Sequence, residues 1–322
     1  MNSNKKMLFI SPCFFDYYKN LIDEFNSRGI KVTWFNDRPS ENFITKSLIR
    51  INKRVLFRKN NRYFKKICNV CRENVFDYVL VIFGQFLNKK YVSKMKELQP
   101  NAKFIYYTWD SLKNFPVINE ISGLFDVRYS FDPEDCKNYG FSFLPLYYCN
   151  NECEAQIKYL ASSILTIKPG KLENYTKVKK MLPKGDIFEY LYIQSKLVFW
   201  FYKFKYKNEF SGYKAKDFKY KKISREKTYS IFSQSAIVID VQMKNQVGLT
   251  MRTFETLNLN RKLITTNSSI KNYDFYDDNN IFVVNDNVKE IPKSFFENEF
   301  KRNYIINEYS IVKFVDKLLK ED

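Results

Sequence analysis

The chain has 322 residues, a length typical of two domains, and its content of 45% hydrophobic and 28% charged residues indicates a folded protein. It carries 54 Lys and Arg against 35 Asp and Glu, a net charge of +19, and it contains no His. The absence of His excludes Ser-His-Asp and Cys-His catalysis, His-ligated zinc or haem, and a His general base.

Apolar runs alternate with amphipathic stretches through the first half of the chain. Short apolar runs predict strands, and apolar residues spaced three and four apart predict helices. The run 78–83 is continuous, which is typical of a strand buried on both faces of a parallel sheet. The predicted strands are 6–10, 30–35, 78–83, 103–108, 127–131 and 141–147, and the predicted helices are 16–28, 62–73 and 89–98.

The polar segment 149–161 is the expected linker, and the same alternation resumes after it. The predicted strands of the second half are 163–167, 187–193, 236–240, 262–266 and 281–284, the predicted helices are 171–182, 224–233 and 249–259, and 296–320 is rich in helix formers. Such alternation implies right-handed crossovers and doubly wound sheets. We therefore expect an α/β protein with one domain over 1–150, a second over 151–322, and a C-terminal helix.

The expected compartment is the cytoplasm. The longest apolar run, 197–202, has six residues, whereas a membrane-spanning helix needs ~20. The N-terminal residues are too poor in apolar side chains for a signal peptide. The six cysteines have no framework spacing, so we expect them to be reduced and structural.

The excess of Lys has two explanations. Lys, Asn, Ile, Phe and Tyr are all abundant and share A/T-rich codons, so coding bias alone would raise the charge. The other explanation is attraction to a polyanion such as an anionic membrane. The segment 203–222 interleaves lysines with aromatic residues. It is either a membrane-facing or acceptor-facing surface or a solvated loop.

Doubly wound sheets bind ligands at the carboxyl ends of their strands, and the segment 246–255 follows the strand 236–240 there. Gly248 leaves room for a ligand, and Thr250 is a candidate cap for the helix that follows. The free N–H groups of the first turn, with the forked side chain of Arg252, suit a diphosphate. Glu255 is a candidate acceptor for ribose hydroxyls. The alternative is an ordinary strand-loop-helix connection with a surface Arg and Glu.

Three other stretches also follow strands. The small polar residues of 265–267 fit either a base or sugar contact or a simple turn. Asp110, flanked by aromatic residues, is either an active-site carboxylate or a helix cap. The acidic stretch 131–135 resembles a metal-binding Asp-x-Asp, but Asp132 capping a helix that starts at Pro133 explains it more simply.

The stretch 11–16 follows the first strand, where a dinucleotide-binding loop would be rich in Gly. No G-x-G-x-x-G and no G-x-x-x-x-G-K-[ST] occurs anywhere in the chain. This argues against NAD-dependent enzymes and P-loop nucleotide hydrolases.

Together these segments resemble the CgeB-like glycosyltransferases of bacterial capsule and lipopolysaccharide gene clusters. The resemblance is strongest at 246–255 and 262–267, and it continues through 270–276. The weaker matches are 107–111, 125–126, 131–135 and 145–147.

The resemblance implies a GT-B fold, in which two Rossmann-like domains face each other across a cleft. The C-terminal domain grips a nucleotide-sugar, which is a substrate and not a cofactor, and the N-terminal domain presents the acceptor. No metal is implied. The implied donor-binding residues are Gln246, Gly248, Leu249, Thr250, Arg252, Glu255 and Asn267. Asp110, with Asp16 behind it, is the implied acceptor-side carboxylate.

One stretch departs from the family pattern. The family begins its second domain with a strand, a Gly and a short His/Ser-Asp-Arg-Tyr stretch. Aligned on Tyr175, this chain has Lys168 for the Gly, Lys171 for the His and Asn174 for the Arg. Lys168 and Lys171 are therefore further candidates for neutralising the diphosphate.

The expected function is transfer of a sugar from a nucleotide-sugar to a growing capsular or lipopolysaccharide glycan. The acceptor is expected on a lipid at the inner face of the plasma membrane, which the basic segment 203–222 would meet electrostatically. One alternative is a non-catalytic scaffold with the same fold at the membrane surface. A second is a nucleic-acid binder, but only charge and interleaved aromatic residues suggest it, and no recognition motif supports it. We expect no nucleic-acid partner.

Overall fold

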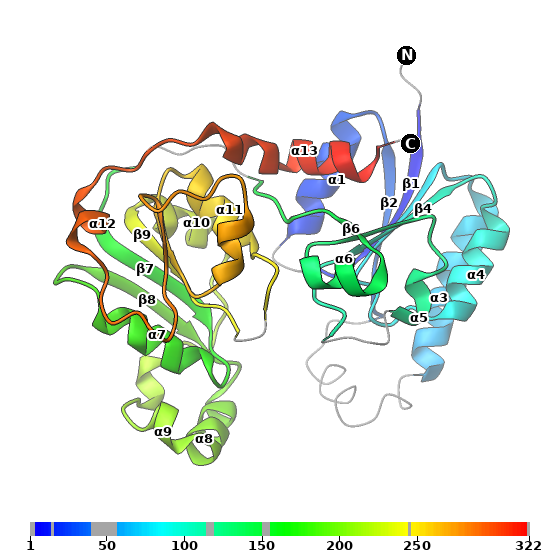
Figure 1. Ribbon diagram of the computed structural model, residues 1–322. Helices are drawn as coiled ribbons and strands as arrows, with labels where there is room; N and C mark the ends of the chain where they lie inside the picture. The colour runs from blue at the N-terminus through cyan, green and yellow to red at the C-terminus, as the bar shows by residue number, and fades with distance from the viewer. Residues whose placement is uncertain are drawn as a thin grey trace. The chain divides into compact units, whose positions relative to one another are not determined.

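The computed structural model describes residues 4–13, 16–39, 57–113, 119–149, 155–243 and 246–320. The chain divides into two compact units. Unit 1 contains Met1–Pro145 and Ile311–Asp322, and unit 2 contains Leu146–Ser310. Each unit is a parallel sheet with helices between successive strands (Figure 1). The α/β class and the doubly wound sheets expected from the sequence are therefore confirmed.

Unit 1 has the strand order β2-β1-β3-β4-β5-β6, with every described pairing parallel. Its strands are β1 Lys6–Ser11, β2 Lys31–Asn36, β3 Tyr78–Ile82, β4 Lys103–Thr108, β5 Val127–Ser130 and β6 Ser142–Phe143. Its helices are α1 Tyr17–Ser27, α3 Phe57–Glu73, α4 Lys89–Leu98, α5 Asn119–Ser122, α6 Pro133–Tyr139 and α13 Ile311–Leu318. The strand order reverses between β1 and β3.

Unit 2 has the strand order β11-β10-β9-β7-β8, again with parallel pairings. Its strands are β7 Tyr159–Thr166, β8 Ile187–Tyr192, β9 Ser235–Asp240, β10 Lys262–Thr265 and β11 Ile281–Val283. Its α-helices are α7 Lys171–Lys180, α8 Lys196–Lys205, α9 Lys207–Phe210, α10 Arg225–Ser233, α11 Met251–Asn258 and α12 Lys293–Glu297. Its 3₁₀ helices are η3 Ala215–Asp217, η4 Ser268–Asn272 and η5 Tyr304–Tyr309. Here the order reverses between β7 and β9.

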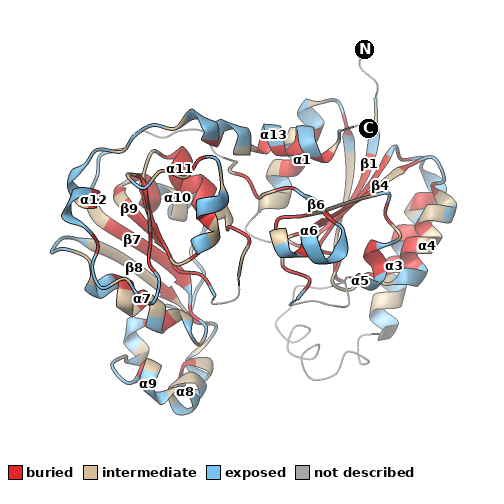
Figure 2. Cartoon of the chain, in the orientation of Figure 1, coloured by how far each residue is buried: buried red, intermediate tan, exposed pale blue. Residues whose placement is uncertain are grey.

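The central strands are buried in both units (Figure 2). All five residues of β3 are buried, as its unbroken apolar sequence predicts for a strand covered on both faces. The five C-terminal residues of β4 are buried in the same way. Because both faces of each sheet are covered, the exposed polar ends of the strands are the places where a site can form.

The C-terminal helix α13 belongs to unit 1, and not to the second domain over 151–322 that its place in the sequence predicts. Its apolar face is buried, and Phe314 meets Tyr107 of β4 edge to face at 5.1 Å between ring centroids. Arg28, at the end of α1, forms an ion pair of 2.6 Å with Asp316. Burial of this apolar face explains why the chain returns to unit 1.

Three element expectations need correction. The expected linker 149–161 runs too far, because Tyr159 and Ala161 already pair with β9. The stretch 296–320, rich in helix formers, contains the end of α12, then η5 and α13, so the C-terminal helix is limited to Ile311–Leu318, because Asn298 ends α12 and the Asn303 side chain caps η5. The expected strand 141–147 is reduced to Ser142–Phe143.

Helix α8 was not predicted as an element. Ser195 begins it by accepting a hydrogen bond from the Val198 amide at 3.2 Å. Within the described helices, none is both long and apolar enough to cross a membrane.

Candidate active site

The best-defined polar cluster lies in unit 2, at the carboxyl ends of β7 and β9. These two strands are neighbours, and the strand order reverses between them. This is the position at which doubly wound sheets bind ligands. The segment after β7 carries Lys168 and Lys171, and the segment after β9 leads to the N-terminus of α11.

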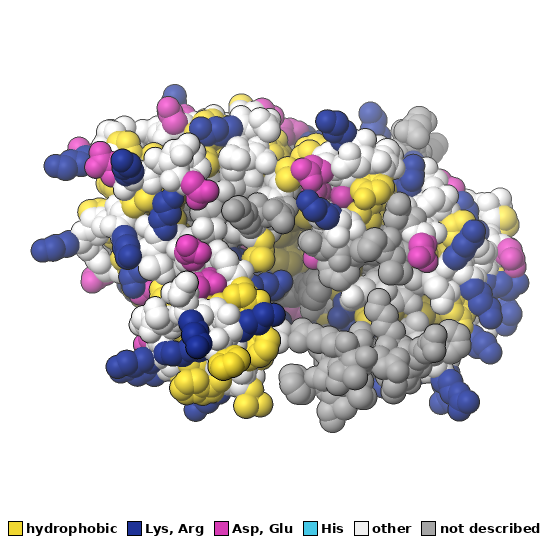
Figure 3. Space-filling view, turned by 60° about the horizontal axis from the view of Figure 1, so that its bottom comes forward, with side chains coloured by type: hydrophobic (Ala, Val, Ile, Leu, Met, Phe, Trp, Pro, Cys, Tyr) yellow, Lys and Arg dark blue, Asp and Glu magenta, His cyan; other side chains and the backbone are white. Residues whose placement is uncertain are grey.

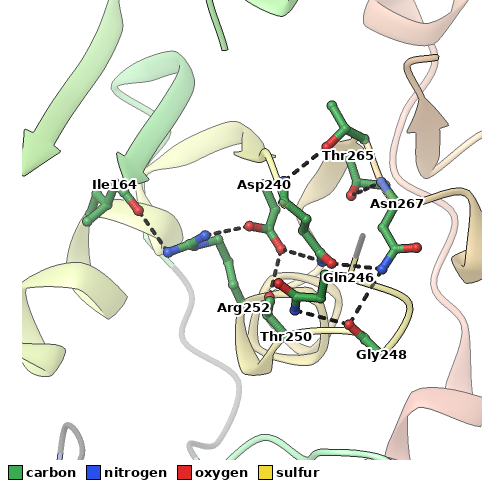
Figure 4. Close-up of polar contacts among 10 residues, drawn as sticks. Ile164, Asp240, Gln246, Gly248, Thr250, Arg252, Thr265 and Asn267 are labelled. Carbon is green, nitrogen blue, oxygen red and sulfur yellow. Dashed lines mark hydrogen bonds and ion pairs between the residues drawn. The ribbon is translucent and has the colours of Figure 1, made fainter. Parts of the chain in front are cut away.

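Asp240, the last residue of β9, organises this cluster (Figure 4). Its carboxylate is fully buried and accepts hydrogen bonds from the side chains of Arg252 at 2.5 Å, Thr250 at 2.7 Å and Gln242 at 3.2 Å. Burial alone would raise the pKa of Asp240, but the charges of Arg252 and Lys171 and these hydrogen bonds hold it below its usual value. Asp240 is thus a buried anion that ties the loop and the start of α11 to the sheet.

The side chain of Arg252 binds two groups of unit 2. Besides its ion pair with Asp240, its guanidinium donates to the Ile164 carbonyl of β7 at 2.7 Å (Figure 4). The structure therefore gives Arg252 a bridging position between β7, β9 and α11. Its expected pairing with a phosphate stays a prediction.

Asn267 fastens the loop that precedes α11. Its side-chain amide donates to the Val247 carbonyl at 2.9 Å and to Gln242 Oε1 at 2.7 Å. Gln246 donates back to the Gly248 carbonyl at 3.1 Å (Figure 4). Gln246, Gly248 and Asn267 therefore shape one loop, and Leu249 beside them is buried. Direct ligand contact by these residues stays a prediction.

The N-terminus of α11 carries no side-chain cap. Thr250 occupies the cap position, but its hydroxyl donates to Asp240 and accepts no hydrogen bond from the first turn. The first turn of α7 is arranged differently, because the Glu209 carboxylate accepts from the amides of Gly170, Leu172 and Glu173 at 2.9–3.1 Å. At α11 the nearby carboxylate, Asp240, accepts from the side chains of Thr250 and Arg252, and no hydrogen bond from a first-turn amide to a cap side chain is present among the described residues.

Lys171 is the titratable group of this cluster with the clearest perturbation. Burial and then the neighbouring charge of Arg252 lower the pKa of Lys171 to about 8, and Lys168 contributes in the same direction. Asp240 opposes this shift. Lys171, Lys168 and Arg252 therefore lie close enough to repel one another, with one buried carboxylate among them. This local excess of positive charge attracts a multivalent anion.

Glu255 lies deeper than a surface position on α11. It is 5% exposed and faces Arg225 of α10, with 3.6 Å between Oε1 and Nε. The same arginine lies beside Cys149, and burial raises the pKa of that thiol to about 12. The surface-residue alternative for Glu255 is wrong, because the side chain points between α10 and α11. Its ribose contact stays a prediction.

We expect Glu255→Gln to lower the free energy of unfolding by about 3 kcal/mol, because it removes the charge of one partner of a buried ion pair. If Glu255 also holds a ribose, the donor KM rises in the same variant. Urea denaturation and donor kinetics separate the two effects, with Glu297→Gln on the exposed surface of α12 as the matched control. Unchanged stability in Glu255→Gln would contradict the ion-pair role.

In unit 1, Asp110 follows β4 and accepts a hydrogen bond from the Ser111 amide at 3.0 Å. Residues 111–113 are not helical, so Asp110 caps no helix within the described residues. Asp135 of α6 holds the next turn by accepting from the Leu112 amide at 3.2 Å and from Ser130 Oγ at 2.9 Å. Burial raises the pKa of Asp135 to about 6.

Asp16 begins α1 with a left-handed backbone, φ 59°, and its carboxylate pairs with Lys19 at 3.1 Å. The adjacent Tyr17 and Trp109 meet edge to face, with 6.4 Å between ring centroids. The loops that carry Asp16 and Asp110 are therefore neighbours at the carboxyl edge of the unit 1 sheet. Residues 14 and 15 of the stretch 11–16 lie outside the described part of the chain.

In the acidic stretch 131–135, the structure shows the helix cap that the sequence suggested as the simpler explanation. Asp132 caps α6 by accepting from the Glu134 amide at 2.9 Å, and Pro133 is the first helical residue. Cys13, Cys68, Cys71, Cys136 and Cys149 are free thiols, and Cys153 lies outside the described residues.

Two important carboxylates were missed as site residues. Asp240 ends an apolar run, Ala236 to Ile239, and that position at a strand end is the signal that could have identified it. Asp135 lies in the acidic stretch 131–135, but its bond to the Leu112 amide could not be inferred, because Leu112 is distant in the sequence.

No family model matches the chain, and no curated protein matches it. Solved structures do. HepE from Anabaena, in complex with UDP and glucose, has a TM-score of 0.59 at 8% identity, covering 97% of this chain and 98% of its own. The lipopolysaccharide outer core galactosyltransferase WaaB has a TM-score of 0.57 at 12% identity, covering 98% and 99%. Sucrose-phosphate synthase from Thermosynechococcus elongatus has a TM-score of 0.61 at 8% identity, covering 88% and 87%.

These likenesses show the fold. The chain has the GT-B fold of two Rossmann-like domains, as the sequence resemblance implied. Membership of the CgeB-like family stays a prediction.

Proposed function

We propose that the protein is a glycosyltransferase that uses a nucleotide-sugar, with the donor bound at the β7–β9 edge of unit 2. The observation that carries the proposal is the cluster at this edge. Arg252 pairs with the buried Asp240, Lys171 feels the charges of Arg252, Asp240 and Lys168, and the N-terminus of α11 lacks a side-chain cap. A diphosphate supplies the multivalent anion that such a cluster attracts.

The chemistry follows from charge. An acceptor hydroxyl attacks the anomeric carbon, the bond from that carbon to the diphosphate oxygen breaks, and the nucleoside diphosphate leaves with the extra negative charge. Lys171 and Lys168, with the first-turn amides of α11, would stabilise that charge as it develops. We propose that no metal is needed, because lysines and helix amides can carry the leaving group.

The acceptor side would lie in unit 1, where Asp110 and Asp16 occupy neighbouring loops. If transfer inverts the anomeric centre, Asp110 takes the proton of the acceptor hydroxyl. If it retains that centre, the departing diphosphate oxygen takes that proton and no carboxylate base is required. The resemblance to CgeB-like enzymes and the likeness to WaaB favour a capsular or lipopolysaccharide glycan as acceptor.

Thermal-shift measurements against UDP-, GDP-, dTDP- and CMP-sugars test the donor assignment. A donor at 100 times its Kd should stabilise the protein by about 2.7 kcal/mol, and the stabilisation should be confined to one of the UDP-, GDP- and dTDP-sugars. CMP-sugars carry a single phosphate, so stabilisation by them alone would contradict the diphosphate assignment. Stabilisation without donor hydrolysis or transfer would instead favour the non-catalytic scaffold. The absence of any shift would contradict the proposal.

The affinity for a nucleoside diphosphate should fall as pH rises above 8. In the free protein the pKa of Lys171 is about 8, and a bound diphosphate raises it by favouring the ammonium form. Binding above pH 8 therefore takes up a proton, and Kd should increase about tenfold from pH 7 to pH 9. Calorimetric titrations at both pH values measure this change.

Two variants serve as controls for this pH effect. Lys171→Arg keeps its charge throughout this range, so its affinity should not change between pH 7 and pH 9. Lys171→Met should bind more weakly at both values, also without pH dependence. A wild-type affinity that does not change with pH would remove Lys171 from the diphosphate site.

A further inference from the structure

Helix α8 exposes an apolar face. Leu197 is 81% exposed, Trp200 59%, Phe201 55% and Phe204 77%. Their spacing of three, four and seven residues places them on one side of the helix. On a surface that faces water, large apolar side chains normally occur singly. A contiguous group of them therefore indicates a surface that contacts a partner.

The helix is held firmly by its opposite face. Phe199 is fully buried and packs against Phe218 at 5.3 Å and Phe210 at 6.4 Å between ring centroids. Glu209, in the adjoining α9, is bound to three amides at the start of α7. The outward apolar face is therefore fixed by packing on the other side of α8.

Lysines accompany this apolar face. Helices α8 and α9 carry Lys196, Lys203, Lys205 and Lys207, and the acidic residue of these two helices is Glu209. A shallow hollow of about 510 Å³ is lined by Trp200, Phe204, Lys203, Lys207 and Ser211. Figure 3 shows hydrophobic side chains gathered beside Lys and Arg over the α8–α9 part of the molecule. The surface is thus apolar at its centre and cationic at its edge.

We propose that α8 docks on an anionic lipid surface, with Leu197, Trp200 and Phe204 entering the interfacial layer and the surrounding lysines meeting lipid phosphates. A helix with Trp, Phe and Leu on one side and Lys around them has the composition of an interfacial helix. A protein partner fits less well, because Lys is depleted in protein–protein interfaces. None of the residues of this surface is among the proposed donor-binding residues, and the inference does not depend on the proposed function.

This changes the contact expected from the sequence. Within 203–222, Phe210 and Phe218 are buried in the unit 2 core and do not reach outward. The apolar contact comes mainly from 197–204, and the basic segment supplies its charge. Because apolar insertion is not screened by salt, part of the binding should survive high salt, unlike binding by lysines alone.

Flotation with vesicles measures the binding. The wild-type protein should bind vesicles of phosphatidylcholine with phosphatidylglycerol at least tenfold more tightly than vesicles of phosphatidylcholine alone. The triple variant Leu197→Ser, Trp200→Ser, Phe204→Ser should lose at least tenfold of that affinity. Lys196→Gln, Lys205→Gln, Lys207→Gln should weaken binding and reduce its salt dependence. Val75→Ser, at a 77% exposed residue outside this surface, is the matched control.

Tryptophan emission tests the depth of insertion. The chain has three Trp, and emission should shift to shorter wavelength on anionic vesicles in the wild type but not in Trp200→Phe, which should still bind. Failure to bind anionic vesicles, or binding equal in the triple variant, would overturn the proposal. Concentration-dependent dimers of the wild type that are lost in the triple variant would instead assign this face to self-association.

Discussion

Asp240→Asn is expected to lower the free energy of unfolding of unit 2 by about 3–5 kcal/mol, the usual cost of removing one partner of a buried ion pair. Asp240 is fully buried and accepts hydrogen bonds from Arg252, Thr250 and Gln242. Asparagine keeps the shape but removes the charge that balances Arg252. The loop before α11 then loses its attachment to β9, so donor affinity should fall with stability. Chemical denaturation and calorimetric titration measure the two effects.

Two comparisons isolate the ion pair. Asp286→Asn, at a carboxylate 95% exposed in the same unit, should change stability by less than about 0.5 kcal/mol. The double variant Asp240→Asn, Arg252→Met should be less destabilised than the sum of its single changes, because the unbalanced charge is gone. Additive effects would show that Asp240 and Arg252 act independently, against the geometry described here.

Asp110→Asn should reduce kcat by about 10²–10⁴, the usual contribution of a general base, while donor binding persists. Asp110 is expected to act as this base because it follows β4, at the carboxyl end of the sheet. Asp135 holds the turn after it by accepting a hydrogen bond from the Leu112 amide. Release of nucleoside diphosphate from the donor, with water or glycan as acceptor, measures the rate.

Asp23→Asn, at an exposed position of α1, is the control for the loss of a carboxylate in unit 1. Asp16→Asn is a second informative variant, since Asn tolerates the left-handed backbone at that residue. It should lower the rate only if Asp16 assists Asp110. An Asp110→Asn protein that melts early but has normal specific activity would show a structural role instead.

The sequence predicts the order of elements well wherever one physical signal dominates. The unbroken apolar run at β3 and the regular apolar spacing of α1 and α11 identify the parallel sheets and their crossovers. The signal fails in 296–320, where asparagine side chains end or begin helices in a segment otherwise rich in helix formers. It also fails at α8, whose apolar residues are divided between a buried face and an exposed one.

The position of the candidate site can be predicted from the sequence, but the contacts among its residues cannot. The segment 246–255 follows a buried strand, so its position at the ligand-binding edge could be inferred. The partners of Arg252 and Glu255 could not, because Asp240, Ile164 and Arg225 reach them only through the tertiary fold. The low pKa of Lys171 likewise arises from burial and from Arg252, which is 81 positions away in the sequence (252 − 171).

Recognition of a nucleotide-sugar diphosphate by unit 2 is tested most directly by calorimetric titration at pH 7 with the nucleoside diphosphate of the class that the thermal-shift series selects and with the same nucleoside without phosphate. Because charge-assisted hydrogen bonds contribute about 1.5–3 kcal/mol each, the nucleoside diphosphate should bind at least about tenfold more tightly than the nucleoside. The double variant Lys168→Met, Lys171→Met should lose most of that difference. Equal affinity for the two ligands, or a preference that survives in the double variant, would contradict diphosphate recognition at this edge.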